Sequence, residues 1–220
     1  MRSIIILVFL VFVTLASKVT GEELLKETKR EVTPMEKHFK ILMPEAQPMQ
    51  RDDYLCSAFG IKDLIIKGTE NSKVYITGFN VNANSSRVGH VAIVRCNKAY
   101  IKEGEVYDCL NRDDKCGPSS RHTAIIYDWG KDAGPISLPA DVGFEVDVDK
   151  DQIVMQVHYK VPLNFKDKTS ADIKYTETKP QYNAGMIILQ KGQFSIPPGV
   201  KNVYADINCK VCLVALYKFH

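Results

Sequence analysis

The side chains best placed for chemistry in this sequence are histidines in strand-like runs. In residues 153–159, the two-residue repeat of a strand places Gln156 and His158 on one face, opposite the apolar face formed by Ile153, Met155, Val157 and Tyr159. His90 opens a second run, His-Val-Ala-Ile-Val. Imidazoles held on rigid strands suit zinc or copper, so a metal site is the first hypothesis. The plainer alternative is that each histidine is only hydrogen-bonded in place.

Other chemistries have less support. The sequence contains no Gly-x-Ser-x-Gly motif, which argues against a serine hydrolase. Cys209 and Cys212 have CxxC spacing, but they lie in a strand-like run where an odd spacing sends them to opposite faces. A redox or zinc motif is therefore disfavoured at this pair. The 29 basic and 26 acidic residues are interspersed rather than clustered, which argues against nucleic-acid binding.

Residues 1–21 have the pattern of a signal peptide. Arg2 precedes an unbroken apolar run from Ile4 to Val13, and small residues follow at Ala16, Ser17 and Gly21. The run is too short to cross a membrane, which takes about 20 apolar residues, and no later segment is longer. We therefore expect a secreted or secretory-pathway protein whose mature chain has no membrane span.

Secretion determines how the cysteines are interpreted, because thiols in an oxidising compartment are mostly bridged. Four of the 6 cysteines fall in one block, at Cys56, Cys96, Cys109 and Cys116. Four cysteines allow three pairings, and spacing alone does not choose among them. In the same block, Asn84-Ser85-Ser86 is an acceptor sequence for N-linked glycan in a polar turn, which predicts Asn84 as a glycosylation site.

The composition, 45% hydrophobic and 25% charged over 220 residues, is that of a globular chain. Residues 22–40 are polar and predict a tail without assigned function. From Ile41 onward, short runs of β-branched and aromatic residues alternate with turn residues, which predicts an all-β sandwich or barrel. The expected strands are 74–79, 90–94, 123–129, 142–149, 153–159, 173–178, 184–189, 203–209 and 213–220.

Several motifs in order resemble the copper type II ascorbate-dependent monooxygenases, and within them the peptidylglycine alpha-hydroxylating branch. The motifs are Tyr54-Leu-Cys-Ser-Ala-Phe59, Gly89-His90-Val-Ala-Ile-Val-Arg-Cys96, Ile126-Tyr-Asp-Trp129, Leu138-Pro-Ala-Asp-Val-Gly-Phe144, Gln156-Val-His-Tyr159, Ile196-Pro-Pro-Gly199 and Ala205-Asp-Ile-Asn-Cys209. The resemblance implies two antiparallel, jelly-roll-like β-sandwich domains with one copper each. Residues 41–164 would form the first domain, and 165–220 the beginning of a truncated second one.

The resemblance also implies a chemistry. Ascorbate would reduce the coppers, and the second site would activate dioxygen to hydroxylate the glycine alpha-carbon of a glycine-extended peptide. The electron-relay copper would be held by a His-His pair and the His of the Gln-x-His-Tyr strand. His90 and His158 match two of these ligands and Gln156 the electron-transfer strand, but Gly89 stands where the third histidine belongs. At most weak copper binding is expected from the two that remain.

At the other end, His220 matches the first histidine of the oxygen-activating site, and Lys218 the residue that contacts the substrate carboxylate. The remaining ligands of that site would be absent from these 220 residues. The family pattern also implies disulfides Cys56–Cys109 and Cys96–Cys116. Cys209 would pair with a cysteine beyond these residues, or Cys209 and Cys212 are buried thiols.

Two functions therefore stay open. One is a copper- and ascorbate-dependent peptidylglycine alpha-hydroxylating monooxygenase, of which this chain is an incomplete portion. The other is a secreted, disulfide-bonded binding protein that descends from the family and is no longer catalytic. The loss of a ligand at Gly89 favours the second, and the Gln156–His158 pattern favours the first. A metal carrier that uses His90 and His158 is a third possibility.

Overall fold

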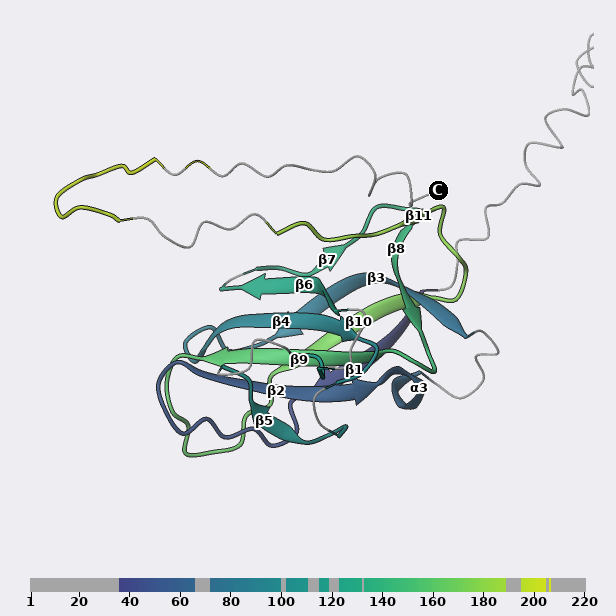
Figure 1. The fold of residues 1–220 in the computed structure, drawn as a ribbon, viewed down its shortest axis with the longest axis horizontal. Helices are drawn as coiled ribbons and strands as arrows, with labels where there is room; N and C mark the ends of the chain where they lie inside the picture. Colours follow the sequence, from purple (N-terminus) through teal and green to yellow (C-terminus); the bar gives the residue numbers. More distant parts are fainter. Residues whose placement is uncertain are drawn as a thin grey trace, which may run out of the picture. The chain divides into compact units, whose positions relative to one another are not determined.

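The computed structural model describes residues 36–65, 72–99, 102–110, 115–118, 123–131, 133–188, 195–204 and 206. These residues form two mostly antiparallel β-sheets in a sandwich-like arrangement, which confirms the predicted fold class (Figure 1). One sheet has the order β5-β2-β9-β4-β6, and the other β1-β10-β3-β8-β11, with β7 also paired to β3.

The five-stranded sheet contains β5 (Val106–Asp108), β2 (Asp53–Gly60), β9 (Gln152–Tyr159), β4 (Val88–Cys96) and β6 (Thr123–Gly130). Residues 91–94 of β4 are buried on both faces of the sheet, which explains why this strand contains a continuous apolar run. The inner face of the sheet contributes Val91, Met155 and Val157 to the main core, while Ala92, Val94 and Val154 belong to a second apolar cluster. The alternation predicted for residues 153–159 is therefore confirmed.

The six-stranded sheet contains β1 (Lys37–Leu42), β10 (Ser170–Thr176), β3 (Lys73–Asn82), β7 (Ile136–Ser137), β8 (Val142–Asp147) and β11 (Tyr182–Asn183). Its edge strand β1 alternates between the core and solvent, since Phe39 and Ile41 are buried between exposed neighbours. Phe39, Ile41, Ile76, Val146 and Ile173 pack into the main core that the two sheets share. A single short helix, α3 (Ile61–Leu64), follows β2 in the described part of the chain.

The sandwich extends beyond residues 41–164 at both ends. β1 begins at Lys37, inside the predicted tail, and β10 lies between β1 and β3 although residues 170–176 were predicted for a second domain. Ala171, Ile173 and Tyr175 are almost completely buried there, so hydrophobic burial fixes β10 to this sandwich. The second domain itself stays a prediction.

The strand expected at 184–189 is wrong for its described part. Residues 184–188 form no strand, and Met186, Ile187 and Ile188 are 38–71% exposed. A short apolar run makes a strand only where another strand pairs with it. The described part of 203–209 also lacks a strand.

Several predictions fall outside the described residues. These are the signal peptide, Cys209, Cys212, Lys218 and His220. Within the described ranges, no helix is long and apolar enough to span a membrane.

Candidate metal centre

The outer face of the five-stranded sheet carries both disulfides. Cys56 of β2 is bonded to Cys109, which follows β5, and Cys96 at the end of β4 is bonded to Cys116. This is the pairing that the family resemblance implies. The four cysteines are at most 2% exposed and form the centre of the second apolar cluster. The disulfides thus make this part of the outer face rigid, next to the polar side chains of Gln156 and His158 on the same face.

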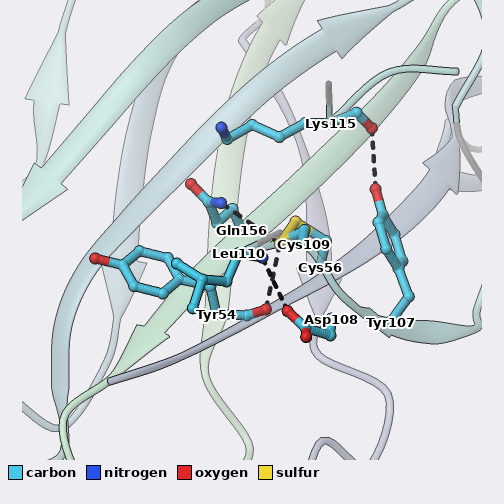
Figure 2. The surroundings of a disulfide bond; sticks show 8 residues. All are labelled: Tyr54, Cys56, Tyr107, Asp108, Cys109, Leu110, Lys115 and Gln156. Carbon is cyan, nitrogen blue, oxygen red and sulfur yellow. Dashed lines mark hydrogen bonds between the residues drawn. A yellow bond between two sulfur atoms is a disulfide. The ribbon is translucent and has the colours of Figure 1, made fainter. Parts of the chain in front are cut away.

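Gln156 lies directly against the first disulfide, as Figure 2 shows. Its side chain is 6% exposed, and Nε2 donates to Cys109 Sγ at 3.4 Å. The backbone N–H of Cys109 donates to Tyr54 O at 2.9 Å, so the segment after β5 is held against β2. Gln156 therefore lies on β9 beside the Cys56–Cys109 disulfide, and His158 follows two residues further along the same face.

His158 is fixed from two sides. The ring of Tyr54, its partner across β2 and β9, stacks on the imidazole with centroids 4.3 Å apart and planes 6° from parallel. Asp52 Oδ1 lies 3.0 Å from His158 Nε2. Because a carboxylate only accepts, Nε2 carries the proton, and the neutral ring keeps its lone pair on Nδ1.

His90 is the direct partner of His158 across β4 and β9, so both imidazoles start from the same face of the sheet. Its Nε2 is paired with Asp128 Oδ1 on β6. The same reasoning leaves the lone pair of the neutral ring on Nδ1. Metal-binding histidines commonly donate their second ring nitrogen to a carboxylate, and both histidines have this arrangement.

Gly89 occupies a β-bulge beside this pair. The pairing of β4 with β9 shifts between Val88 and His90, where one extra residue is inserted. In a regular strand, positions 89 and 90 would face opposite sides, but a Cβ built on Gly89 would lie 3.0 Å from His158 Nδ1. The bulge therefore turns position 89 toward the histidine face, where it supplies no donor atom.

The residues present are of a type that binds copper, but they are fewer than a copper site needs. Two imidazoles with free Nδ1 lone pairs are suitable copper donors. In the described part of the chain, however, no group of three or more His, Cys, Asp or Glu side chains is placed to hold a metal ion. Copper bound here would depend on His90 and His158, with water completing its coordination.

The structure thus brings together His90, His158 and Gln156, and leaves Lys218 and His220 outside the described residues. Sequence reasoning missed the carboxylates of Asp52 and Asp128. Asp128 lies within the Ile126–Trp129 motif, so its position was a usable signal. Asp52 precedes β2 with a positive φ of 55°, and nothing in the sequence pointed to it.

Comparisons with known proteins show what this chain is similar to. Residues 39–166 match the family described as "Copper type II ascorbate-dependent monooxygenase, N-terminal domain". The chain is 29% identical over 175 residues to peptidyl-glycine alpha-amidating monooxygenase A of Xenopus laevis, covering 77% of this chain and 17% of that protein. It is 27% identical over 197 residues to peptidylglycine alpha-amidating monooxygenase of Rattus norvegicus, covering 86% of this chain and 19% of that one. The chain thus spans less than a fifth of the length of these relatives.

Proposed function

Because this chain belongs to the copper type II ascorbate-dependent monooxygenase family, we propose that it acts in copper- and ascorbate-dependent alpha-hydroxylation of glycine-extended peptides. Residues 37–176 would serve as the N-terminal, electron-relay domain of that activity. The names of the relatives, peptidyl-glycine alpha-amidating monooxygenases, support the substrate class.

The observation that carries the proposal is the cross-strand pair His90 and His158, each with a carboxylate on Nε2. Copper at this pair would supply one-electron transfer, with ascorbate as the reductant. The protein would hold both imidazoles in place through Asp52, Asp128 and the Tyr54 ring. Since the third donor position is Gly89, we expect the affinity for copper to be low.

The first experiment is a copper titration of the purified, disulfide-bonded chain, followed by the electron paramagnetic resonance signal of Cu(II). One weakly bound copper with nitrogen ligands is expected, and His90→Ala or His158→Ala should each abolish it. His38→Ala is the matched control, because His38 is exposed on β1 in the other sheet. Binding that is unchanged in both histidine variants would place copper elsewhere and remove the basis of the proposal.

The peptide reaction needs its own assay. The chain is incubated with copper, ascorbate, dioxygen and a glycine-extended peptide, and the alpha-hydroxylated product is measured by mass spectrometry. Lys218 and His220 are the residues that we propose for the substrate carboxylate and the oxygen-activating copper. Copper- and ascorbate-dependent product formation that is lost in His220→Ala would support the role of His220, and a raised KM for the peptide in Lys218→Ala would support the role of Lys218.

A second function is favoured by Gly89. The missing donor, together with carboxylates that already pair with both imidazoles, is also what a secreted, non-catalytic binding protein of this family would have. A folded chain with both disulfides, no detectable copper binding and no peptide hydroxylation would support this alternative over the monooxygenase.

A further inference from the structure

We propose that Asn84 carries an N-linked glycan. The acceptor sequence Asn84-Ser85-Ser86 occupies the turn that joins β3 to β4. Asn84 O accepts the N–H of Arg87 at 2.9 Å and that of Val88 at 2.8 Å, which closes the turn directly over the three acceptor residues. The motif is thus presented at a tight chain reversal between two strands, outside the ladders of both sheets.

The side chains of Asn84 and Ser86 are exposed and leave the carboxamide nitrogen of Asn84 out of the hydrogen bonds of the turn. Asn84 Oδ1 accepts the backbone N–H of Ser86 at 3.0 Å and also its hydroxyl. Both bonds use the carbonyl oxygen of the carboxamide, so Nδ2 makes no hydrogen bond with any described residue. The nitrogen that must react is therefore not engaged by the described residues, on a side chain that is exposed.

The modification would be an ordinary group transfer in the secretory lumen. A bond forms between Asn84 Nδ2 and the anomeric carbon of an oligosaccharide carried on a lipid pyrophosphate. The bond from that carbon to the pyrophosphate oxygen breaks, the lipid pyrophosphate leaves, and Nδ2 loses one proton. The two disulfides support passage through this compartment, because such bonds form and persist where the environment is oxidising.

The contacts that hold the turn in place do not involve the Asn84 carboxamide nitrogen. Lys160 Nζ donates to Ser85 O, and the Arg87 guanidinium lies 5.1 Å from the centre of the Phe165 ring. A glycan on Asn84 would therefore leave the turn and the adjacent bulge at Gly89 intact. It would also cover the exposed end of the β3–β4 connection.

The test is to express the full chain in a eukaryotic cell with a secretory pathway and to measure the intact mass of the secreted protein. Treatment with a peptide-N-glycosidase should lower the mass and convert Asn84 to Asp in the tryptic peptide. Asn84→Gln and Ser86→Ala should both be secreted at the unglycosylated mass, since one lacks the nitrogen acceptor and the other the required hydroxyl.

Two controls separate the motif from a general effect on the turn. Ser86→Thr keeps a hydroxyl and should remain glycosylated, and Asn82→Gln changes a neighbouring exposed asparagine without touching the motif. A secreted wild-type protein with unmodified Asn84 would overturn the proposal. Retention of the wild-type chain in the cytosol would overturn it equally, because the transfer takes place only in the lumen.

Discussion

At the scale of single residues, Tyr159 links the core to the segment that connects β9 with β10. Its side chain is fully buried, and its hydroxyl donates to Asp167 Oδ2 at 2.8 Å. The same oxygen accepts the N–H of Thr169 at 2.8 Å. Burial, and then the charge of Asp167, raise the pKa of Tyr159 above its ordinary value of 10.0, so the hydroxyl remains a donor at neutral pH. The buried carboxylate thus depends on this donor.

Replacing Tyr159 by Phe should lower the free energy of unfolding by about 1.5–3 kcal/mol, because a buried charged acceptor loses one of its hydrogen bonds. Urea unfolding at pH 7 measures the change. Tyr175→Phe is the control, since Tyr175 is equally buried but its hydroxyl makes no hydrogen bond with the described residues. Equal losses in the two variants would show that the Tyr159–Asp167 bond contributes nothing specific.

The histidine site shows which parts of a site can be predicted from sequence. The shared face of Gln156 and His158 follows from the two-residue repeat of a single strand, and the structure confirms it. The contacts of Asp52 with His158 and of Asp128 with His90 depend on segments that are distant in the chain. Such contacts depend on register and on the bulge at Gly89, which local sequence patterns do not encode.

At the scale of elements, the disulfides hold β5 and the segment around Cys116 against the outer face of the five-stranded sheet. β5 has only three residues and one strand partner, β2. Such a short edge strand gains little from its own hydrogen bonds. The Cys56–Cys109 disulfide and the hydrogen bond from Cys109 N–H to Tyr54 O therefore keep β5 in place. They also hold the backbone of Tyr54, whose ring stacks on His158.

Removing either disulfide by a double Cys→Ala replacement should cost about 2–5 kcal/mol. The sequence separations are 53 for Cys56–Cys109 and 20 for Cys96–Cys116. In the chain-entropy account, the longer loop makes the first bond worth about 1 kcal/mol more. Guanidinium unfolding of the two double variants tests this order. A larger loss on removing Cys96–Cys116 would mean that native contacts, and not loop closure, decide the contribution.

At the scale of the whole molecule, the sandwich is completed by strands from both sides of the predicted first domain. The sequence predicted an all-β sandwich from its short runs, and this was sufficient for the fold class. It did not identify β1, because Lys37 and Lys40 give that segment a polar appearance. It also assigned β10 to the next domain, because the position of a strand within a sheet depends on long-range pairing.

Two fragments test this account of the domain. Residues 36–176 should fold into a disulfide-bonded protein with a cooperative unfolding transition. Residues 41–164 should not, because they lack β10, whose loss leaves one edge of β3 unpaired and removes Ala171, Ile173 and Tyr175 from the shared core. Near-ultraviolet circular dichroism and urea unfolding of both fragments provide the measurement. A cooperatively folded 41–164 fragment would show that β10 is dispensable and that the boundary predicted from the sequence is adequate.

The most direct test of the copper-domain account is the affinity of Gly89→His for copper, measured by competition with a chelator. The bulge directs position 89 toward His158 Nδ1, so an added imidazole should tighten binding by on the order of tenfold, about 1.4 kcal/mol. His158 must shift by a few tenths of an ångström to admit the new Cβ.

Gly89→Asn is the matched control, with a similar demand for space but a poorer copper donor. Tighter binding in Gly89→His alone, lost again when His158→Ala is added, is the predicted result. Equal affinities in the wild type, Gly89→His and Gly89→Asn would contradict the assignment of a copper site to this face.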